Sequence, residues 1–221
     1  MKAIILGSTG AVGRALVNDL VSNSKFDEIR AITRRDYDFN IQSPKFSTKV
    51  VDFNALDSHA AELRGFDAIF VTMGTTRAVA GSAENFIAID QDLTVRAAQA
   101  ALTSGKEQHL LYVSSAGAST SSYFLYPKSK GQTEDRLRAL GATKTTIFRP
   151  AFLIVEEPRA RARLVENIFS SVVPKARYLG IRSMSAGVGE VAKALRVVAE
   201  DSKRAVRDPV NNADILALCA E

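Results

Sequence analysis

Short apolar runs alternate along the chain with longer stretches in which apolar residues recur at helical spacing. Residues 3–6 read Ala-Ile-Ile-Leu, as in a buried strand, whereas residues 11–21 place Val12, Leu16 and Leu20 on one helical face. The same patterns predict strands at residues 29–33, 49–52, 68–73, 109–113 and 145–148, and helices at residues 84–104, 127–140, 187–200 and 213–218. This alternation indicates an α/β fold, in which helices cover both faces of a parallel sheet of six or seven strands.

Residues 151–185 interrupt this alternation after the sixth predicted strand. The segment contains Pro158, Pro174 and several arginines. Ligands of open α/β sheets bind beyond the carboxyl ends of the strands, so we interpret the segment as an excursion on the substrate side. An edge insertion without function is the alternative. We expect residues 1–221 to form a single domain that includes this excursion.

The composition of the chain indicates its cellular compartment and the class of binding partner to expect. The chain of 221 residues is 46% apolar and 24% charged, which disfavours a disordered or coiled-coil protein. Its one cysteine, Cys219, rules out an intrachain disulfide and a thiolate zinc site, and we expect it to pack a helix. Neither a signal peptide nor a membrane-spanning run is recognisable, so a cytoplasmic location is expected. The net charge of +5 favours anionic partners.

A glycine-rich turn joins the first predicted strand to the first predicted helix. Its spacing is G-x-x-G-x-x-G. Glycines allow a tight turn and close approach of backbone N–H groups to a pyrophosphate, and the helix N-terminus adds donors and partial positive charge. This context predicts a Rossmann-type, doubly wound dinucleotide-binding fold. The expected cofactor-binding residues of the turn are Gly7, Ser8, Thr9, Gly10, Ala11, Val12 and Gly13.

The end of the second predicted strand indicates which dinucleotide binds. A site for NAD places Asp or Glu there, on the ribose hydroxyls. This chain has Arg34 and Arg35 instead. Because guanidinium groups bind phosphate through paired, charge-assisted hydrogen bonds, the sequence predicts NADP(H) rather than NAD. The alternative is a solvated surface pair, which Asp36 and Asp38 could neutralise.

Two further strand ends carry candidate cofactor contacts. Asp52 follows the third predicted strand, where its carboxylate could accept a hydrogen bond from an adenine amino group or cap the following turn. Gly74 ends the fourth, and the glycine there would bring the backbone close to the cofactor.

Tyr126 and Lys130 have the spacing Y-x-x-x-K near the start of a predicted helix, which places them on one helical face. A free tyrosine titrates near pKa ~10, too high for an effective base at neutral pH. A neighbouring ammonium favours the phenolate, so the pair could exchange a proton with a hydroxyl or carbonyl group. Lys130 could also bind the nicotinamide ribose. We therefore predict both residues as catalytic and cofactor-binding.

Ser114 and Ser115 end the fifth predicted strand, where a hydroxyl group could polarise a substrate carbonyl beside the tyrosine. We predict Ser115 as the catalytic serine, with Ser114 as its alternate. The alternative is that the two serines have no catalytic role and that their hydroxyl groups cap the turn after the strand.

In these motifs the chain resembles the short-chain dehydrogenase/reductase superfamily. It is most similar to the atypical branch of the HIV-Tat-interacting-protein oxidoreductase family, whose fungal members are associated with the mitochondrial outer membrane. The resemblance covers nearly the whole chain. Its most specific stretches are residues 51–53, 73–77, 80–81, 114–118, 121–126, 130–131 and 148–150.

The resemblance implies NADPH held by the glycine turn, by the two arginines and by the loop around Met73 and Gly74. It implies Tyr126 as proton donor and acceptor, with Lys130 as its partner. Leu153 and Arg161 fall where the family's lid touches the cofactor. Conventional members complete a proton relay with an asparagine in the long helix, and Asp90 stands where the extended branch keeps that residue.

Together these observations predict an NADPH-dependent oxidoreductase that acts on a small carbonyl or alcohol substrate. The alternative is an NADPH-binding regulatory or scaffold protein with little turnover. A protein partner and peripheral association with a membrane, the mitochondrial outer membrane in a fungus, stay open. We expect no nucleic-acid partner, because no aromatic residues interleave with the arginines of residues 159–163. We expect no metal site, because His59 and His109 are isolated and His109 is expected to be structural.

Overall fold

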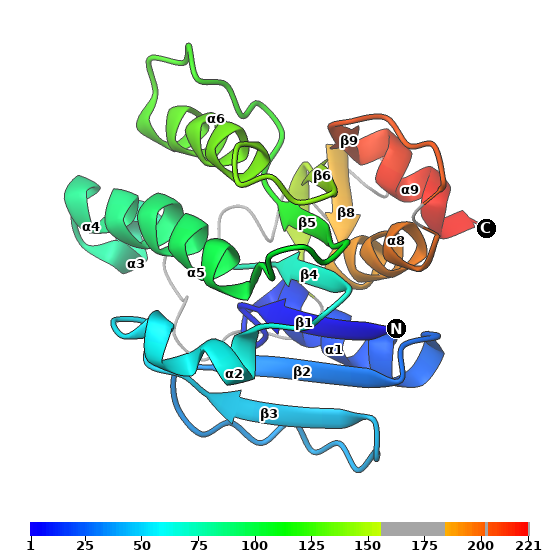
Figure 1. Ribbon diagram of the computed structural model, residues 1–221. Helices are drawn as coiled ribbons and strands as arrows, with labels where there is room; N and C mark the ends of the chain where they lie inside the picture. The colour runs from blue at the N-terminus through cyan, green and yellow to red at the C-terminus, as the bar shows by residue number, and fades with distance from the viewer. Residues whose placement is uncertain (156–183, 202, 221) are drawn as a thin grey trace.

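The structure is a computed structural model, and it describes residues 1–155, 184–201 and 203–220. Its described part contains a seven-stranded sheet of order β3-β2-β1-β4-β5-β6-β9, in which every neighbouring pair is parallel (Figure 1). The strands are β1 (Lys2–Leu6), β2 (Glu28–Thr33), β3 (Phe46–Val50), β4 (Ala68–Val71), β5 (His109–Val113), β6 (Lys144–Arg149) and β9 (Val210–Asn211). The strand order reverses between β1 and β4, where doubly wound sheets bind ligands.

Helices cover both faces of the sheet, as the alternating pattern predicts. Apolar side chains of α1 (Ala11–Asn23), α8 (Val188–Glu200) and α9 (Asn212–Ala220) form one core layer with the sheet. The other layer contains η1 (Leu56–His59), α2 (Ala60–Leu63), α5 (Thr94–Ala101) and α6 (Leu125–Arg138). The arrowheads of β3 and β4 in Figure 1 point toward α3 (Arg77–Ala80) and α4 (Ala83–Ile87), so these short helices lie at the carboxyl side of the sheet.

The helix predicted at residues 84–104 is continuous but not uniform. It comprises α4, a π-helix η2 (Ala88–Leu93) and α5, which ends at Ala101. The Thr94 hydroxyl donates to the carbonyl of Ile89 (3.3 Å), across the wider π turn. Apolar periodicity does not distinguish this turn from an α-helical one. The π-helix buries Asp90, so it places a carboxylate inside the protein.

Other boundaries differ from the predicted ones at exposed or short elements. The third strand was predicted at residues 49–52, which is wrong by several residues, because β3 ends at Val50 and contains no buried residue. The apolar residues Val51 and Phe53, which suggested a strand there, belong to the turn that follows it. The fourth strand ends at Val71 rather than at residue 73. The sequence pattern did not predict η1, α2, α3 or β9.

Most of the excursion predicted at residues 151–185 lies outside the described residues. Its two ends are described: β7 (Phe152–Ile154) and β8 (Ser185–Gly187) pair in parallel as a separate two-stranded sheet, with Leu153 opposite Ala186. This pairing, which the sequence did not predict, brings both ends of the excursion together beside the end of β6.

His109 lies buried at the start of β5, as expected for a structural histidine. Its Nε2 is 2.8 Å from the Thr146 hydroxyl, and its Nδ1 has no partner among the described residues. Burial, and to a lesser degree the charge of Lys144, lowers the pKa of His109 from 6.5 to about 4. The folded protein therefore resists the protonation that the unfolded chain undergoes near pH 6.5.

We expect His109 to make the protein less stable as the pH falls. Below pH 6.5 the unfolded chain binds a proton that the folded chain excludes until about pH 4. The contribution present above pH 6.5 is lost over this window and amounts to about 3 kcal/mol. Urea unfolding at pH 7 and pH 4.5 should show a smaller difference for His109→Gln than for the unchanged protein. Equal pH dependence in the two proteins would contradict this explanation.

Candidate functional site

The glycine turn between β1 and α1 packs tightly against the end of β4. Gly7 has a φ of +89°, and the N–H of Gly10 donates to its carbonyl oxygen (3.0 Å). A Cβ atom at Gly7 would lie 2.6 Å from the backbone nitrogen of Met73, and one at Gly13 would collide with the Gly7 carbonyl. Side chains are therefore excluded at these positions. The turn leads directly into the N-terminus of α1, where the first N–H groups have no intrahelical partner.

The turn is also tied to the strand that carries the two arginines. Ser8 is fully buried, and its hydroxyl donates to the carbonyl of Ile32 in β2 (2.7 Å). Arg34 and Arg35 follow this strand and are exposed. Among the described residues neither guanidinium forms a hydrogen bond or an ion pair, so the neighbouring carboxylates do not neutralise them. Both groups are available to an anion at the end of β2.

Asp52 caps its own turn, which is one of the two roles predicted for it. Its Oδ1 accepts hydrogen bonds from the backbone (2.9 Å) and side-chain amide (3.1 Å) of Asn54. Its backbone N–H donates to Nε2 of His59 (3.3 Å). The contact with adenine stays a prediction.

A buried cluster surrounds the amino group of Lys130. Its Nζ donates to Oδ1 of Asp90 (3.1 Å) and to the hydroxyl oxygen of Tyr112 (3.1 Å). Burial opposes the charge of the amine, but Tyr112, Asp90 and Tyr126 together outweigh it, so the pKa of Lys130 is raised. Lys130 is therefore a fixed cation at neutral pH, held by groups from η2, β5 and α6.

Tyr126 lies one turn before Lys130 on α6, on the same helical face, as the spacing predicts. The Lys130 Nζ is 5.9 Å from the centre of the Tyr126 ring, and the centre of the Phe86 ring is 6.0 Å from it. Tyr126 is 43% exposed, so a substrate can reach it from solvent. The arrangement combines an accessible phenol with a buried cation.

The structure distinguishes the two serines that follow β5. The Ser114 hydroxyl donates to Oε1 of Glu134 (2.6 Å), and Arg149 holds both oxygens of the same carboxylate (2.9 and 2.6 Å). Ser115, in contrast, has a buried hydroxyl with no partner among the described residues. Ser114 is thus engaged in a structural network, whereas the buried hydroxyl of Ser115 is left without a hydrogen bond among the described residues.

The loop after β4 links the glycine turn to the lysine cluster. A Cβ atom at Gly74 would lie 3.3 Å from Oδ1 of Asp90 and 3.5 Å from Nζ of Lys130. The backbone N–H of Thr75 donates to the same carboxylate oxygen (3.1 Å). Met73, one residue earlier, borders Gly7. The loop therefore brings the two halves of the predicted site into contact.

The remaining cofactor contacts concern the excursion. Leu153 lies on β7 and is 41% exposed, whereas Arg161 lies outside the described residues. Sequence reasoning missed Tyr112, which reads as an ordinary apolar strand residue, and Glu134, whose burial no local pattern indicates. The one feature of the sequence that could have indicated Tyr112 is its position, two residues before Ser114.

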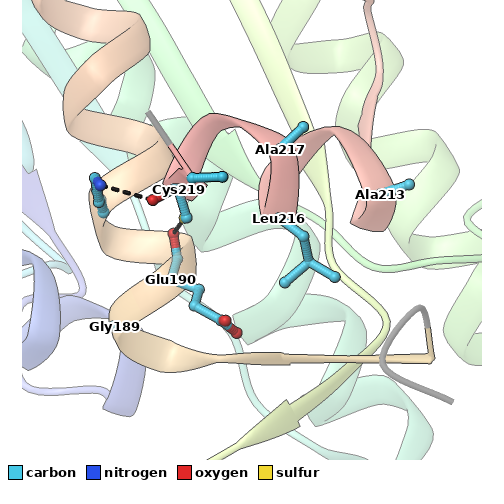
Figure 2. Close-up of a pocket in the computed structure, with 8 residues that line it drawn as sticks. Gly189, Glu190, Ala213, Leu216, Ala217 and Cys219 are labelled. Carbon is cyan, nitrogen blue, oxygen red and sulfur yellow. Dashed lines mark hydrogen bonds between the residues drawn. The ribbon is translucent and has the colours of Figure 1, made fainter. Parts of the chain in front are cut away.

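A cavity of about 620 Å³ lies elsewhere, between α8 and α9 (Figure 2). Gly189, Glu190, Leu216 and Cys219 are among its lining residues, and none of the predicted site residues is. The Cys219 thiol donates to the carbonyl of Glu190 (3.0 Å), and burial raises its pKa. Cys219 packs against the core, as expected for a structural thiol.

Within the described residues, no helix combines the length and apolar character needed to cross a membrane. The same part of the chain contains no cluster of histidine, cysteine and carboxylate side chains that could bind a metal ion.

Comparison with known proteins identifies relatives that match most of the chain. The sequence model of the NAD(P)H-binding family matches residues 7–174. The protein HTATIP2 of Rattus norvegicus is 34% identical over 72% of this chain and 66% of its own length. The protein FMP52 of Candida albicans, described as mitochondrial, is 40% identical over 71% of this chain and 69% of its own. The chain thus spans about two thirds of the length of each.

Solved structures agree with the fold. A short-chain dehydrogenase/reductase from Brucella melitensis, described as a glucose/ribitol dehydrogenase, superimposes with a TM-score of 0.70 at 17% identity, over 96% of both chains. An oxidoreductase from Lactococcus lactis gives 0.64 at 18% identity, over 100% of this chain and 98% of its own. At these identities the likeness establishes the Rossmann-type architecture alone.

Proposed function

The chain belongs to the NAD(P)H-binding family and is related to HTATIP2 and FMP52, and from this premise we propose that it is an NADPH-dependent oxidoreductase. Its substrate would be a small carbonyl compound or the corresponding alcohol. The observation that carries the proposal is the exposed phenol of Tyr126 beside the buried ammonium of Lys130, together with the Ser115 hydroxyl after β5, which has no partner among the described residues. A cofactor-binding protein without turnover has no need of this set.

The residues present fit a nicotinamide dinucleotide. The glycine turn at the N-terminus of α1, which excludes side chains at Gly7 and Gly13, would hold the pyrophosphate, and Arg34 with Arg35 would hold the 2′-phosphate. Lys130 would hold the nicotinamide ribose. Asp52, Met73, Gly74, Leu153 and Arg161 complete the proposed contacts. The reduced cofactor would supply the hydride.

Three side chains would handle the substrate carbonyl. Ser115 would donate a hydrogen bond to the carbonyl oxygen and orient it. Tyr126 would donate its phenolic proton to that oxygen as the carbonyl carbon gains hydride, which yields the alcohol and leaves a phenolate. The Lys130 ammonium would stabilise this phenolate, and solvent would return the proton to the exposed ring. In the opposite direction the phenolate would accept the alcohol proton.

The proposal is tested by following the NADPH absorbance band in the presence of a panel of aldehydes, ketones and quinones. We expect oxidation of NADPH that requires both the protein and a carbonyl substrate, with formation of the matching alcohol. Tight binding of NADPH without turnover on any member of the panel would contradict the proposal.

Cofactor choice gives a separate prediction. Reversing both charges at the end of β2, in the variant Arg34→Glu/Arg35→Glu, should weaken NADPH binding by about 100-fold and leave NADH within about threefold, because charge-assisted bonds contribute about 1.5–3 kcal/mol each. Titration of both cofactors by fluorescence measures this. The variant Lys49→Glu, on the neighbouring edge strand, controls for half of the change in net charge, −2 instead of −4. Equal losses for NADPH and NADH would show that the arginines do not read the 2′-phosphate.

A second candidate function is an NADPH-binding regulator whose partner surface responds to the cofactor. The observation that favours it is the buried carboxylate of Asp90, which pairs with Lys130 and so reduces the positive field available to a phenolate. The substrate panel separates the two functions, since a regulator would bind NADPH without consuming it.

A further inference from the structure

Asp90 and Lys130 form an ion pair that is almost completely withdrawn from solvent. Their side chains are 0% and 5% exposed, and Nζ and Oδ1 are 3.1 Å apart. Oδ1 also accepts the N–H of Thr75, whereas the buried Oδ2 has no partner among the described residues. The pair therefore lies at the loop that joins the glycine turn to the proposed catalytic groups.

The carboxylate is what balances the ammonium. Tyr112, the other group bound to Nζ, has a pKa raised to about 12 by burial, so it is neutral at physiological pH. The hydrogen bond from Thr75 adds no net charge. The site therefore carries a net charge of zero with Asp90 ionised, and would carry +1 with a neutral residue at position 90. In a buried site such a difference is weakly screened.

We propose that Asp90 is a specificity-determining residue that lets the site accept the oxidised, positively charged nicotinamide as well as the reduced, neutral one. The inference rests on the proposed function, in which Lys130 binds the nicotinamide ribose. An unpaired ammonium there would repel the oxidised ring and leave the reduced ring unaffected. The Asp90 carboxylate cancels this repulsion. Asp90 thereby sets the ratio of the two affinities, and with it the ease with which oxidised cofactor stays bound after carbonyl reduction.

The test measures the dissociation constants of NADP⁺ and NADPH for four proteins: the unchanged chain, Asp90→Asn, Lys130→Met and the double variant. The quantity compared is the NADP⁺ constant divided by the NADPH constant. We expect this ratio to rise about tenfold in Asp90→Asn and to fall about tenfold in Lys130→Met, the scale of one unit charge about 10 Å away at an effective dielectric constant of about 20. The double variant, again neutral, should return to the ratio of the unchanged chain.

Tyr112→Phe is the matched control, because it removes a hydrogen bond from Lys130 without changing any charge. Its ratio should stay within about twofold of the unchanged chain. If Asp90→Asn does not fold, Lys130→Met still tests the proposal through the opposite sign. Equal weakening of both cofactor forms, or ratios that move in the same direction in the two single variants, would overturn it.

Turnover separates this inference from the function on which it rests. The ratios are binding measurements and need no reaction. If the ratios of dissociation constants are as predicted but the protein does not turn over any member of the carbonyl panel, the oxidoreductase function is wrong and the role of Asp90 stands. Unchanged ratios in a protein that reduces carbonyl compounds would remove only the role of Asp90.

Discussion

Replacing Tyr126 with phenylalanine is expected to lower kcat for carbonyl reduction by about 100- to 10,000-fold, the range that a positioned proton donor contributes. The variant loses only the phenolic hydroxyl, so the packing of the ring against Phe86 remains. NADPH binding should stay within about threefold, because the proposed ribose contact belongs to Lys130, which Asp90 and Tyr112 still hold. Steady-state kinetics and a fluorescence titration of NADPH measure the two quantities.

The matched control is Tyr123→Phe. Tyr123 precedes the same helix but is fully exposed, and loss of its hydroxyl should leave kcat unchanged. Turnover retained by Tyr126→Phe, or lost equally in both variants, would show that the hydroxyl of Tyr126 is not the proton donor.

Replacing Glu134 with alanine is expected to lower the free energy of unfolding by about 3 kcal/mol, the lower end of the range for breaking a buried ion pair. Glu134 accepts hydrogen bonds from Ser114 and, through both oxygens, from Arg149. The change would leave the guanidinium without its main anionic partner and the serine hydroxyl without an acceptor. Glu134 lies on α6, Arg149 on β6, and Ser114 directly after β5, so the loss should affect the centre of the fold. Urea unfolding measures it.

Asp135→Ala serves as the control for Glu134→Ala. The adjacent carboxylate is 67% exposed and lies 3.8 Å from Arg138, a surface pair that contributes at most about 1 kcal/mol. We expect a change below about 0.5 kcal/mol for this variant. Similar unfolding midpoints for the two variants would contradict a special role of the Glu134 network.

Much of the fold could be predicted because its main signals are local. The apolar run of β1, the glycine turn and the stripe of α1 stand next to one another in the sequence, and the order of strands and helices then specifies a doubly wound sheet. Strand β5, and the position of Tyr126 and Lys130 on one helical face, could be predicted from the sequence in the same way. The edge strand β3 was misplaced because it is exposed, and the edge strand β9 was missed because it is short. Both form by pairing with a neighbouring strand, and their own apolar pattern does not indicate them.

The inner contacts of the site could not be predicted, because they join residues distant in sequence. Nothing local shows that η2 turns the Asp90 carboxylate onto Lys130, 40 positions later. The sequence also does not show which of the two serines donates a hydrogen bond to Glu134. In the structure Ser114 does, and the Ser115 hydroxyl has no partner among the described residues. Charge and hydrogen-bond pairing of this kind depends on how α6 and η2 pack over β5.

The most direct test of the proposed oxidoreductase function is transfer of deuterium from NADPH, labelled at the reacting carbon of the nicotinamide, to a carbonyl compound identified in the panel. Mass spectrometry of the alcohol reports the transfer. The proposed function predicts an alcohol with one deuterium on the former carbonyl carbon when the unchanged protein is present, and almost none with Tyr126→Phe. Bound, labelled NADPH that delivers no deuterium to any product would contradict it.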